Sequence, residues 1–215
     1  MELRWRGSAV AFRNSLGWVK SFLRLKLNNR KFTLEQCRKS ALVRYAVPIM
    51  TADEVKHLLQ LEPLQAEGGF FRETYRSRRT VPEEYLPGGM RSPRSIGTAI
   101  YFMLTRESFS AQHRLPGTEI FHFYLGDPVI MLQLLPDGTS QTITLGPDLA
   151  GGQRPQVVVR GGVWQGSRLA PGGKFALLGT TMSPGFDYAD FELGDREQLM
   201  AQYPGAAEMI RRFTR

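Results

Sequence analysis

Cysteine is nearly absent from this sequence, since Cys37 is the single one among 215 residues. One thiol cannot close a disulfide within the chain and cannot supply a cysteine-rich zinc site, so disulfide-stapled domains and zinc fingers are excluded. Cys37 also has no histidine close to it in the sequence, which favours an incidental thiol over an activated nucleophile. These features suit a reducing compartment, and we expect a cytoplasmic protein.

Long hydrophobic runs are absent as well. No apolar stretch approaches the roughly 20 residues that a helix needs to cross a bilayer, which argues against a transmembrane protein. The 22 glycines and 13 prolines are generous for this length, and such a turn-rich composition favours a fold built from strands.

Excess positive charge is confined to the N-terminal quarter of the chain. Residues 1–49 hold eleven Lys and Arg and two acidic residues, a net charge of +9. Residues 50–215 hold seventeen Lys and Arg and eighteen acidic residues, a net charge of −1. The formal charge of the whole chain therefore says nothing about its larger part, and we expect no nucleic-acid partner.

The basic segment 1–49 has apolar residues at helical spacings of three and four. These residues are Phe12, Leu16, Val19, Phe22 and Leu23. Three interpretations stay open: a transit-type segment for an organelle, a segment that contacts an anionic membrane surface, or an extension without a role. The third is the one we favour.

A new structural unit is expected to begin at Met50, which is also a candidate translation start. Thr51 and Glu54 have the spacing of a capping box, which predicts a helix of about ten residues ending near Pro63. We therefore divide the chain into a basic N-terminal extension, residues 1–49, and one domain, residues 50–215.

Short segments rich in β-branched and aromatic residues follow this helix, separated by glycine- and proline-rich turns. The predicted strands lie within 68–77, 95–104, 118–126, 128–136, 141–146, 156–162 and 174–183. The turn PDG predicts a hairpin, and a last helix is interrupted at Pro204. This many half-buried strands without long helices predicts an all-β fold of two sheets packed face to face, with short flanking helices.

One stretch, HRLPGTEIFHFYLGD at 113–127, is rich in polar residues and reads as one strand. His113, Leu115, Glu119 and Gly126 have the spacing H-x-H-x3-E-x6-G, with leucine in place of the second histidine. Further on, RGGVWQ matches P-x-G-x2-H, with arginine in place of proline and Gln165 in place of histidine.

Both patterns are cupin motifs, and the chain resembles a branch of bacterial and yeast cupins known by a domain-of-unknown-function label. The likeness rests on the blocks EGGFFRETYRS, AIYFMLT, EIFHFYLGDPV, RPQVVV and SPGFDYADFEL. It implies a double-stranded β-helix, the RmlC-like jelly-roll barrel, with a small-molecule pocket and a homodimeric assembly. The chain departs from the branch at Gln65 and Ala66, where histidine and proline are more usual.

The ligand set of this barrel is incomplete for a metal. Metallocupins bind iron, manganese, nickel or zinc through three histidines and a glutamate, whereas the matching positions here hold His113, Leu115, Glu119 and Gln165. Leucine cannot ligate a metal, and a neutral amide is a weak substitute for imidazole. His122 cannot complete the set, because side chains alternate along a strand and His122 points away from Glu119. We favour no cofactor; a divalent metal, if bound, would use His113, Glu119 and Gln165.

The remaining polar groups suit proton transfer. The resemblance directs His113, Glu119 and Gln165 inward, and a histidine beside a carboxylate can act as a general base. Metal-free cupins include epimerases of keto-deoxysugars, which use such a pair. We therefore take His113 and Glu119 as catalytic candidates, with Gln165, Trp164, Tyr101 and Arg72 as ligand-binding candidates. The segment 184–192 is predicted to be a lid or a sheet edge.

Three functions remain open at this point. The first choice is a cupin that binds a small polar metabolite, such as a sugar or nucleotide derivative, and isomerises or epimerises it without metal. The second is a metal-dependent cupin enzyme with an incomplete ligand set. The third is a cupin that binds its ligand without turnover.

Overall fold

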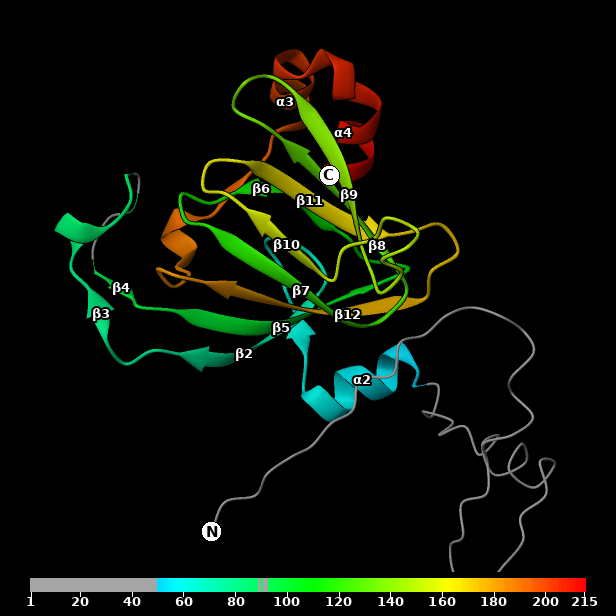
Figure 1. The fold of residues 1–215 in the computed structure, drawn as a ribbon, viewed down its shortest axis with the longest axis horizontal. Coiled ribbons are helices and arrows are strands. Elements are labelled where there is room, and N and C mark those ends of the chain that lie inside the picture. Colours follow the sequence, from blue (N-terminus) through cyan, green and yellow to red (C-terminus); the bar gives the residue numbers. More distant parts are fainter. Residues whose placement is uncertain (1–49, 89, 91–92) are drawn as a thin grey trace, which may run out of the picture. The chain divides into compact units, whose positions relative to one another are not determined.

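A computed structural model gives the fold and describes residues 50–88, 90 and 93–215. The expectations for residues 1–49, from the amphipathic helix to targeting, membrane contact and Cys37, lie outside the described residues. The described domain consists of two antiparallel sheets that face each other, with short helices at their margins (Figure 1).

The first sheet has six strands. Their order is β1 (Glu62–Pro63), β2 (Phe70–Arg76), β5 (Thr98–Thr105), β12 (Phe175–Met182), β7 (Glu119–Gly126) and β10 (Gln156–Val159). The second sheet has five strands, in the order β13 (Glu192–Leu193), β6 (Ser110–Arg114), β11 (Trp164–Leu169), β8 (Val129–Leu134) and β9 (Ser140–Leu145). The pair β3 (Thr80–Val81) and β4 (Arg94–Ser95) forms a small third sheet. This is the predicted all-β jelly roll, and the hairpin between β8 and β9 turns at PDG as expected.

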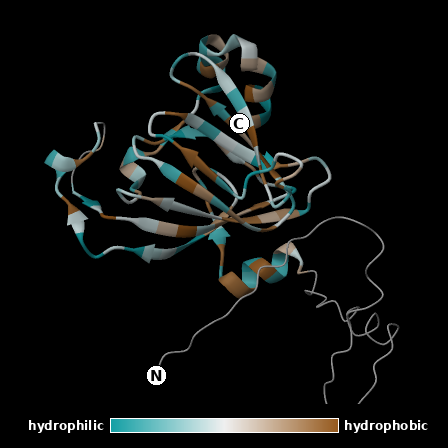
Figure 2. Ribbon diagram, viewed as in Figure 1, coloured by the Kyte–Doolittle hydropathy of each residue, from teal (hydrophilic) through white to brown (hydrophobic). Residues whose placement is uncertain are grey.

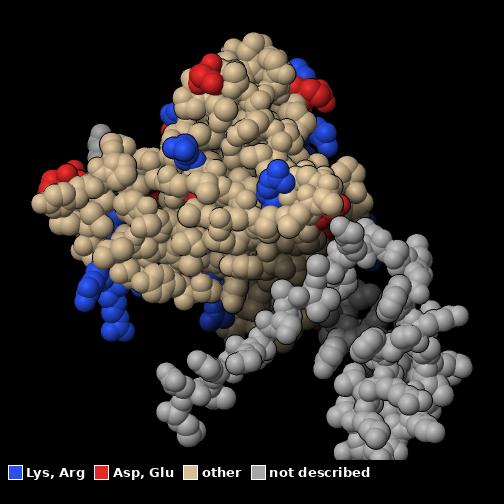
Figure 3. Space-filling view, viewed as in Figure 1, with Lys and Arg blue, Asp and Glu red and all other residues tan. Residues whose placement is uncertain are grey.

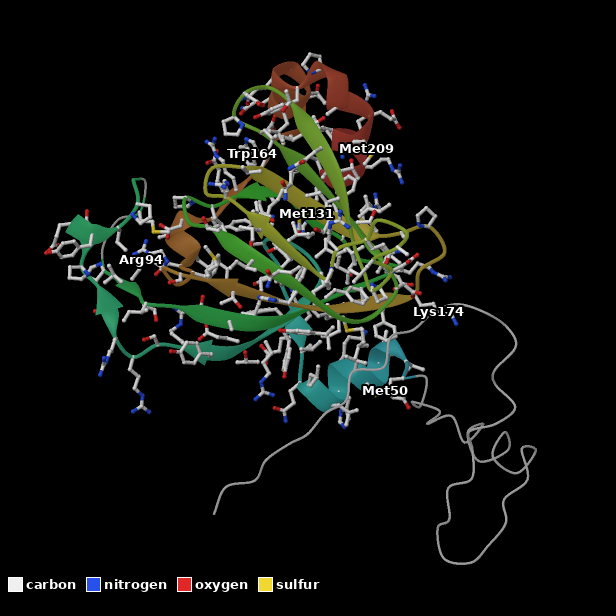
Figure 4. The ribbon with its side chains drawn as sticks, viewed as in Figure 1. Met50, Arg94, Met131, Trp164, Lys174 and Met209 are labelled. Carbon is white, nitrogen blue, oxygen red and sulfur yellow. The ribbon has the colours of Figure 1, made fainter. Side chains whose placement is uncertain are left out.

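The main core fills the space between the two sheets. Strand β8 illustrates the alternation, because Met131 points into this core whereas Leu132 and Leu134 point to the outer face. The ribbon changes between brown and teal along single strands, as this alternation requires (Figure 2). Met131 lies in the middle of the barrel (Figure 4). Each fully buried side chain of this size contributes about 1.5–3 kcal/mol of hydrophobic free energy.

Helix α2 (Ala52–Leu59) confirms the capping-box prediction. Glu54 N donates to Thr51 Oγ1 at 3.2 Å, and Thr51 N donates to Glu54 Oε2 at 2.7 Å. The helix ends at Gln60, three residues before Pro63, and buries Val55 against the outer face of the first sheet.

The C-terminal helical segment covers the outer face of the second sheet and breaks at proline as predicted. It consists of α3 (Arg196–Gln202), η3 (Pro204–Ala206) and α4 (Ala207–Phe213). Ile210 and Phe213 pack with Trp164 of β11, and Figure 4 shows Trp164 and Met209 on this side of the barrel. The 3-10 turns η1 (Glu83–Tyr85) and η2 (Tyr188–Asp190) complete the elements.

The prediction of a single strand over 113–127 is wrong. His113 lies on β6 in the second sheet and Glu119 on β7 in the first, so the motif spans the barrel. Strand β6 was not predicted, and neither was β11, which carries Gln165. Their sequences, SAQHR and WQGSRL, lack an apolar alternation because several of their inward positions carry polar side chains.

The surface of the described domain carries little charge on the face shown in Figure 3, where most atoms belong to uncharged residues. Within the described part of the chain, no helix has the length and apolar character that crossing a membrane requires.

Gly126, the last residue of β7, is the glycine of the first motif, and its substitution shows how much that position contributes to stability. Its φ is +100°, and a Cβ there would lie 2.4 Å from the carbonyl oxygen of Phe175. Gly138 also has a positive φ, +85°, but a Cβ there would meet no atom within 4 Å. We expect Gly126→Ala to lower the free energy of unfolding by about 2 kcal/mol more than Gly138→Ala, because only the first substitution adds a clash to the backbone strain.

Denaturant titration of both variants measures this difference. Equal losses for the two glycines would contradict the close approach between β7 and β12.

Candidate functional site

A cavity lies between the two sheets and has a volume of about 80 Å³. Its walls come from strands β2, β5, β6, β7 and β12, from the loop before β2, and from the segment around η2. The polar side chains that line it are Glu67, Glu73, Arg76, Thr98, His113, Glu119, Thr180 and Tyr188. The cavity thus contains more carboxylates than cations.

His113 is the imidazole of this cavity and is 2% exposed. Its Nδ1 lies 2.8 Å from the carbonyl oxygen of Ala111, which can only accept a hydrogen bond. The proton of the neutral ring therefore sits on Nδ1, and Nε2 carries the lone pair. Phe191 stacks on the ring with centroids 5.2 Å apart. Burial lowers the pKa of His113, and the charge of Glu119 opposes that shift without reversing it.

Glu119 and Gln165 form a hydrogen-bonded pair beside this ring. Gln165 Nε2 donates to Glu119 Oε2 at 2.6 Å and lies 3.4 Å from His113 Nε2. Burial raises the pKa of Glu119, and the negative charge of Glu67 raises it further. The Gln165 Oε1 atom is buried and has no hydrogen-bond donor within the described residues.

Glu67 is a site residue that the sequence interpretation missed. Its Oε2 lies 3.9 Å from His113 Nε2, and its Oε1 accepts a hydrogen bond of 2.5 Å from Ser110. Burial raises the pKa of Glu67 to about 7, although the Ser110 hydrogen bond and the charge of Arg215 act in the opposite direction. Glu67 therefore changes protonation near neutral pH.

The signal for Glu67 was the glycine pair that follows it. Gly68 and Gly69 both have positive φ angles, and a Cβ on Gly68 would lie 2.2 Å from the carbonyl oxygen of Phe109. Two such glycines bring the loop against the barrel, and the carboxylate before them is carried inward. The sequence EGG belongs to a block that carries the family resemblance, but it does not by itself predict where the Glu67 side chain points.

None of the four predicted ligand-binding residues lines the cavity: Gln165 is buried behind it and holds Glu119, and the other three lie elsewhere. Arg72 is exposed and donates to Gln60 Oε1 and to the Leu59 carbonyl. Tyr101 lies on the outer face of the first sheet beside α2, and Trp164 packs against the C-terminal helices. Their placement does not support the ligand contacts that we expected of them.

A β-bulge explains why Arg76, and not Arg72, reaches the cavity. Regular alternation along β2 would put Arg72 and Arg76 on the same, outer face of the sheet. The register between β2 and β5 shifts between Glu73 and Tyr75, so Thr74 is the extra residue. Glu73 and Arg76 consequently both line the cavity.

His122 points away from Glu119, as strand alternation predicted. Its ring nitrogens lie 3.4 Å from Gln156 Nε2 and 3.3 Å from Thr181 Oγ1, on the outer face of the first sheet. It takes no part in the cavity.

The segment 184–192 is a cavity wall and a sheet edge. Phe186, Tyr188 and Phe191 line the cavity, and β13 pairs with β6. A buried ion pair holds the segment, because Arg94 Nη2 and Asp190 Oδ1 are 2.7 Å apart.

The donor set does not fit a divalent metal ion in this arrangement. A metal needs several lone-pair donors that converge on one point. Here the Gln165 amide donates to Glu119 and lies 3.4 Å from His113 Nε2, so a hydrogen-bond donor occupies the space between these ligand atoms. Leu115 supplies only hydrocarbon. Across the described residues, no three His, Cys, Asp or Glu side chains are grouped so that they could hold an ion. We therefore derive the chemistry of the site from its own side chains.

A two-sheet jelly roll with polar side chains directed into a central cavity is the architecture of cupins. Residues 53–194 match the family described as Cupin superfamily (DUF985), and the chain belongs to that family. The resemblance drawn from the motifs is thereby confirmed.

Similar proteins span distant organisms. The chain is 33% identical over 132 residues to the uncharacterized protein YML079W of Saccharomyces cerevisiae, a match that covers 58% of this chain and 66% of that protein, slightly under two thirds of its length. A crystal structure of a protein from Shewanella oneidensis is 36% identical with a TM-score of 0.68 and covers 78% of this chain and 99% of that one. A hypothetical protein from Leishmania major is 32% identical with a TM-score of 0.69, over 77% and 99% of the two chains.

We predict that Glu67→Gln changes stability in a pH-dependent way. Because the pKa of Glu67 rises from 4.5 to about 7 on folding, the folded state holds this proton more tightly than the unfolded chain. The contribution of this proton to the free energy of unfolding is fully present at pH values below 4.5 and is lost as the pH rises through about 7. A glutamine cannot ionise, so the variant should gain about 2 kcal/mol relative to the wild type between about pH 5 and pH 8.

Denaturant titrations at both pH values measure this gain. Glu62→Gln, which removes a carboxyl from the exposed strand β1, is the matched control. A Glu67→Gln effect of the same size at both pH values would show that the carboxyl is not perturbed.

Proposed function

We propose that the chain binds a small polar metabolite in the barrel cavity and isomerises or epimerises it by proton transfer next to a carbonyl group. The observation that carries this proposal is the orientation of His113. Its Nδ1 proton is committed to the Ala111 carbonyl, and its Nε2 lone pair lies 3.9 Å from the carboxyl of Glu67. His113 Nε2 can therefore accept a proton, and the nearby Glu67 carboxyl can supply one.

The pKa values of the two groups are displaced in opposite directions. Burial lowers the pKa of His113, so its imidazole is neutral at pH 7 and can act as a base. Burial raises the pKa of Glu67 to about 7, so a substantial fraction of this carboxyl is protonated and can act as an acid. Acid and base assignments of this kind follow from the environments of titratable pairs.

The proposed step breaks a carbon–hydrogen bond beside the carbonyl of the ligand. The proton moves to His113 Nε2, and the electron pair moves onto the carbonyl oxygen, which takes a proton from the Glu67 carboxyl. In an α-hydroxy carbonyl ligand, the resulting enediol takes the proton of the imidazolium at the former carbonyl carbon. Glu67 recovers a proton from the hydroxyl of the neighbouring carbon, which becomes the new carbonyl, so the ligand is isomerised. Glu119 stabilises the imidazolium through its charge, and Gln165 holds Glu119 in place.

Loss of proton exchange in His113→Ala tests the proposed base. A panel of free aldoses, ketoses, sugar nucleotides and small keto acids is incubated with the protein in heavy water, and proton NMR follows the carbon-bound protons. We expect exchange in at least one compound and a loss of about 100-fold or more in His113→Ala, because a positioned base contributes this much. His122→Ala, whose ring lies outside the cavity, is the matched control and should exchange normally.

Two outcomes favour the other functions. Retained exchange in His113→Ala removes the base role. A compound that raises the melting temperature without any exchange indicates a binding protein. One equivalent of iron, manganese, nickel or zinc in protein purified without chelator would support the metal-dependent alternative and contradict the metal-free proposal.

A further inference from the structure

The charge of the cavity indicates which ligands it accepts. Glu67 and Glu119 are the most buried carboxyls of the cavity wall, and their hydrogen-bond donors are neutral: Ser110 for Glu67, and Gln165 and Thr180 for Glu119. Among the described residues, no lysine or arginine nitrogen lies within 4.0 Å of either carboxyl. Arg215 acts on Glu67 only from a longer distance, and its guanidinium donates to the Gln65 carbonyl. Buried carboxylates without a cationic partner are costly, so the site favours a positive charge from outside.

Arg76, the one guanidinium that the described residues contribute to the cavity wall, is already engaged. Arg76 Nε and Nη2 donate to the two oxygens of Glu73 at 3.0 and 2.6 Å, and Nη1 donates to the Phe186 carbonyl at 3.0 Å. A ligand phosphate or carboxylate would therefore face Glu67 and Glu119 without a free counter-charge in this wall.

Aromatic rings form the apolar part of the same cavity. Phe71, Phe186 and Tyr188 line it, and the last two pack edge to face with centroids 5.0 Å apart. Rings combined with carboxylates are the combination that recognises organic ammonium ions.

We infer that the cavity selects a small organic ammonium ion, whose charge lies against Glu67 and Glu119 and whose carbon skeleton lies against the rings. The inference rests on the proposed function, because it concerns the ligand of the same cavity. One ammonium balances one carboxylate, so the second carboxyl keeps its proton for the acid role. Phosphorylated and nucleotide ligands are accordingly disfavoured among the metabolites considered above, and amino-substituted carbonyl compounds are favoured.

A matched series of probes tests the charge preference without knowledge of the natural ligand. Cyclohexylamine, cyclohexanol and cyclohexanecarboxylate share one skeleton and differ in charge at neutral pH. Their binding to the full chain is measured by ligand-observed NMR at equal concentrations. We expect the amine to bind about tenfold or more tightly than the alcohol, a factor typical of one charge-assisted contact, and the carboxylate not to bind.

Amino-acid substitutions identify the carboxyls that cause the preference for the amine. Glu67→Gln combined with Glu119→Gln should remove the advantage of the amine over the alcohol, whereas the exposed Glu62→Gln should keep it. Glu73→Gln frees Arg76 and should create measurable binding of the carboxylate, which tests the charge balance even if the double variant does not fold.

Equal binding of amine and alcohol, binding of the carboxylate by the wild type, or absence of amine binding overturns the inference. Stoichiometric binding of added Mn²⁺ or Zn²⁺ that displaces the amine and is lost in the double variant overturns it in favour of a metal cation. These outcomes are separate from the exchange experiment, because charge selection can fail while His113-dependent exchange persists.

Discussion

The hydrogen bond from His113 Nδ1 to the Ala111 carbonyl determines the properties of the cavity. It fixes the tautomer of a buried imidazole and leaves Nε2 without a proton, 3.4 Å from the Gln165 amide and 3.9 Å from Glu67 Oε2. Without this bond the ring could present a proton to the cavity instead of a base. The raised pKa of Glu67 has its main cause in burial in the same small space, so the burial that keeps His113 neutral also makes Glu67 an acid near pH 7.

The jelly roll makes this arrangement possible because it brings distant parts of the chain to one point. Strands β6 and β11 carry His113 and Gln165 side by side in one sheet, while β7 carries Glu119 in the other. Where a metallocupin has further histidines, this chain has Leu115 and Gln165. The Gln165 amide holds Glu119 through a hydrogen bond. The strand positions that carry metal ligands in a metallocupin therefore hold hydrogen-bonded, titratable side chains in this chain.

Much of the fold could be predicted from the sequence, because capping, turn and alternation signals are local. Thr51 and Glu54, the PDG turn and the break at Pro204 all act within a few residues. The strands β6 and β11 were missed because polar side chains on them face the cavity and erase the apolar alternation. Arg76 was not among the candidates because the bulge at Thr74, which turns its side chain into the cavity, depends on pairing with β5. Glu67 was missed because its approach to His113 depends on a tertiary contact between Gly68 and Phe109.

Nitrogen NMR of the His113 ring tests the central claim most directly. The ring is labelled with nitrogen-15 and its signals are assigned by comparison with His57→Gln and His122→Gln variants. The account predicts a neutral ring near pH 7, with the proton on Nδ1 and no proton on Nε2. A proton on Nε2, or protons on both nitrogens at this pH, would contradict the role of His113 as the base of the cavity.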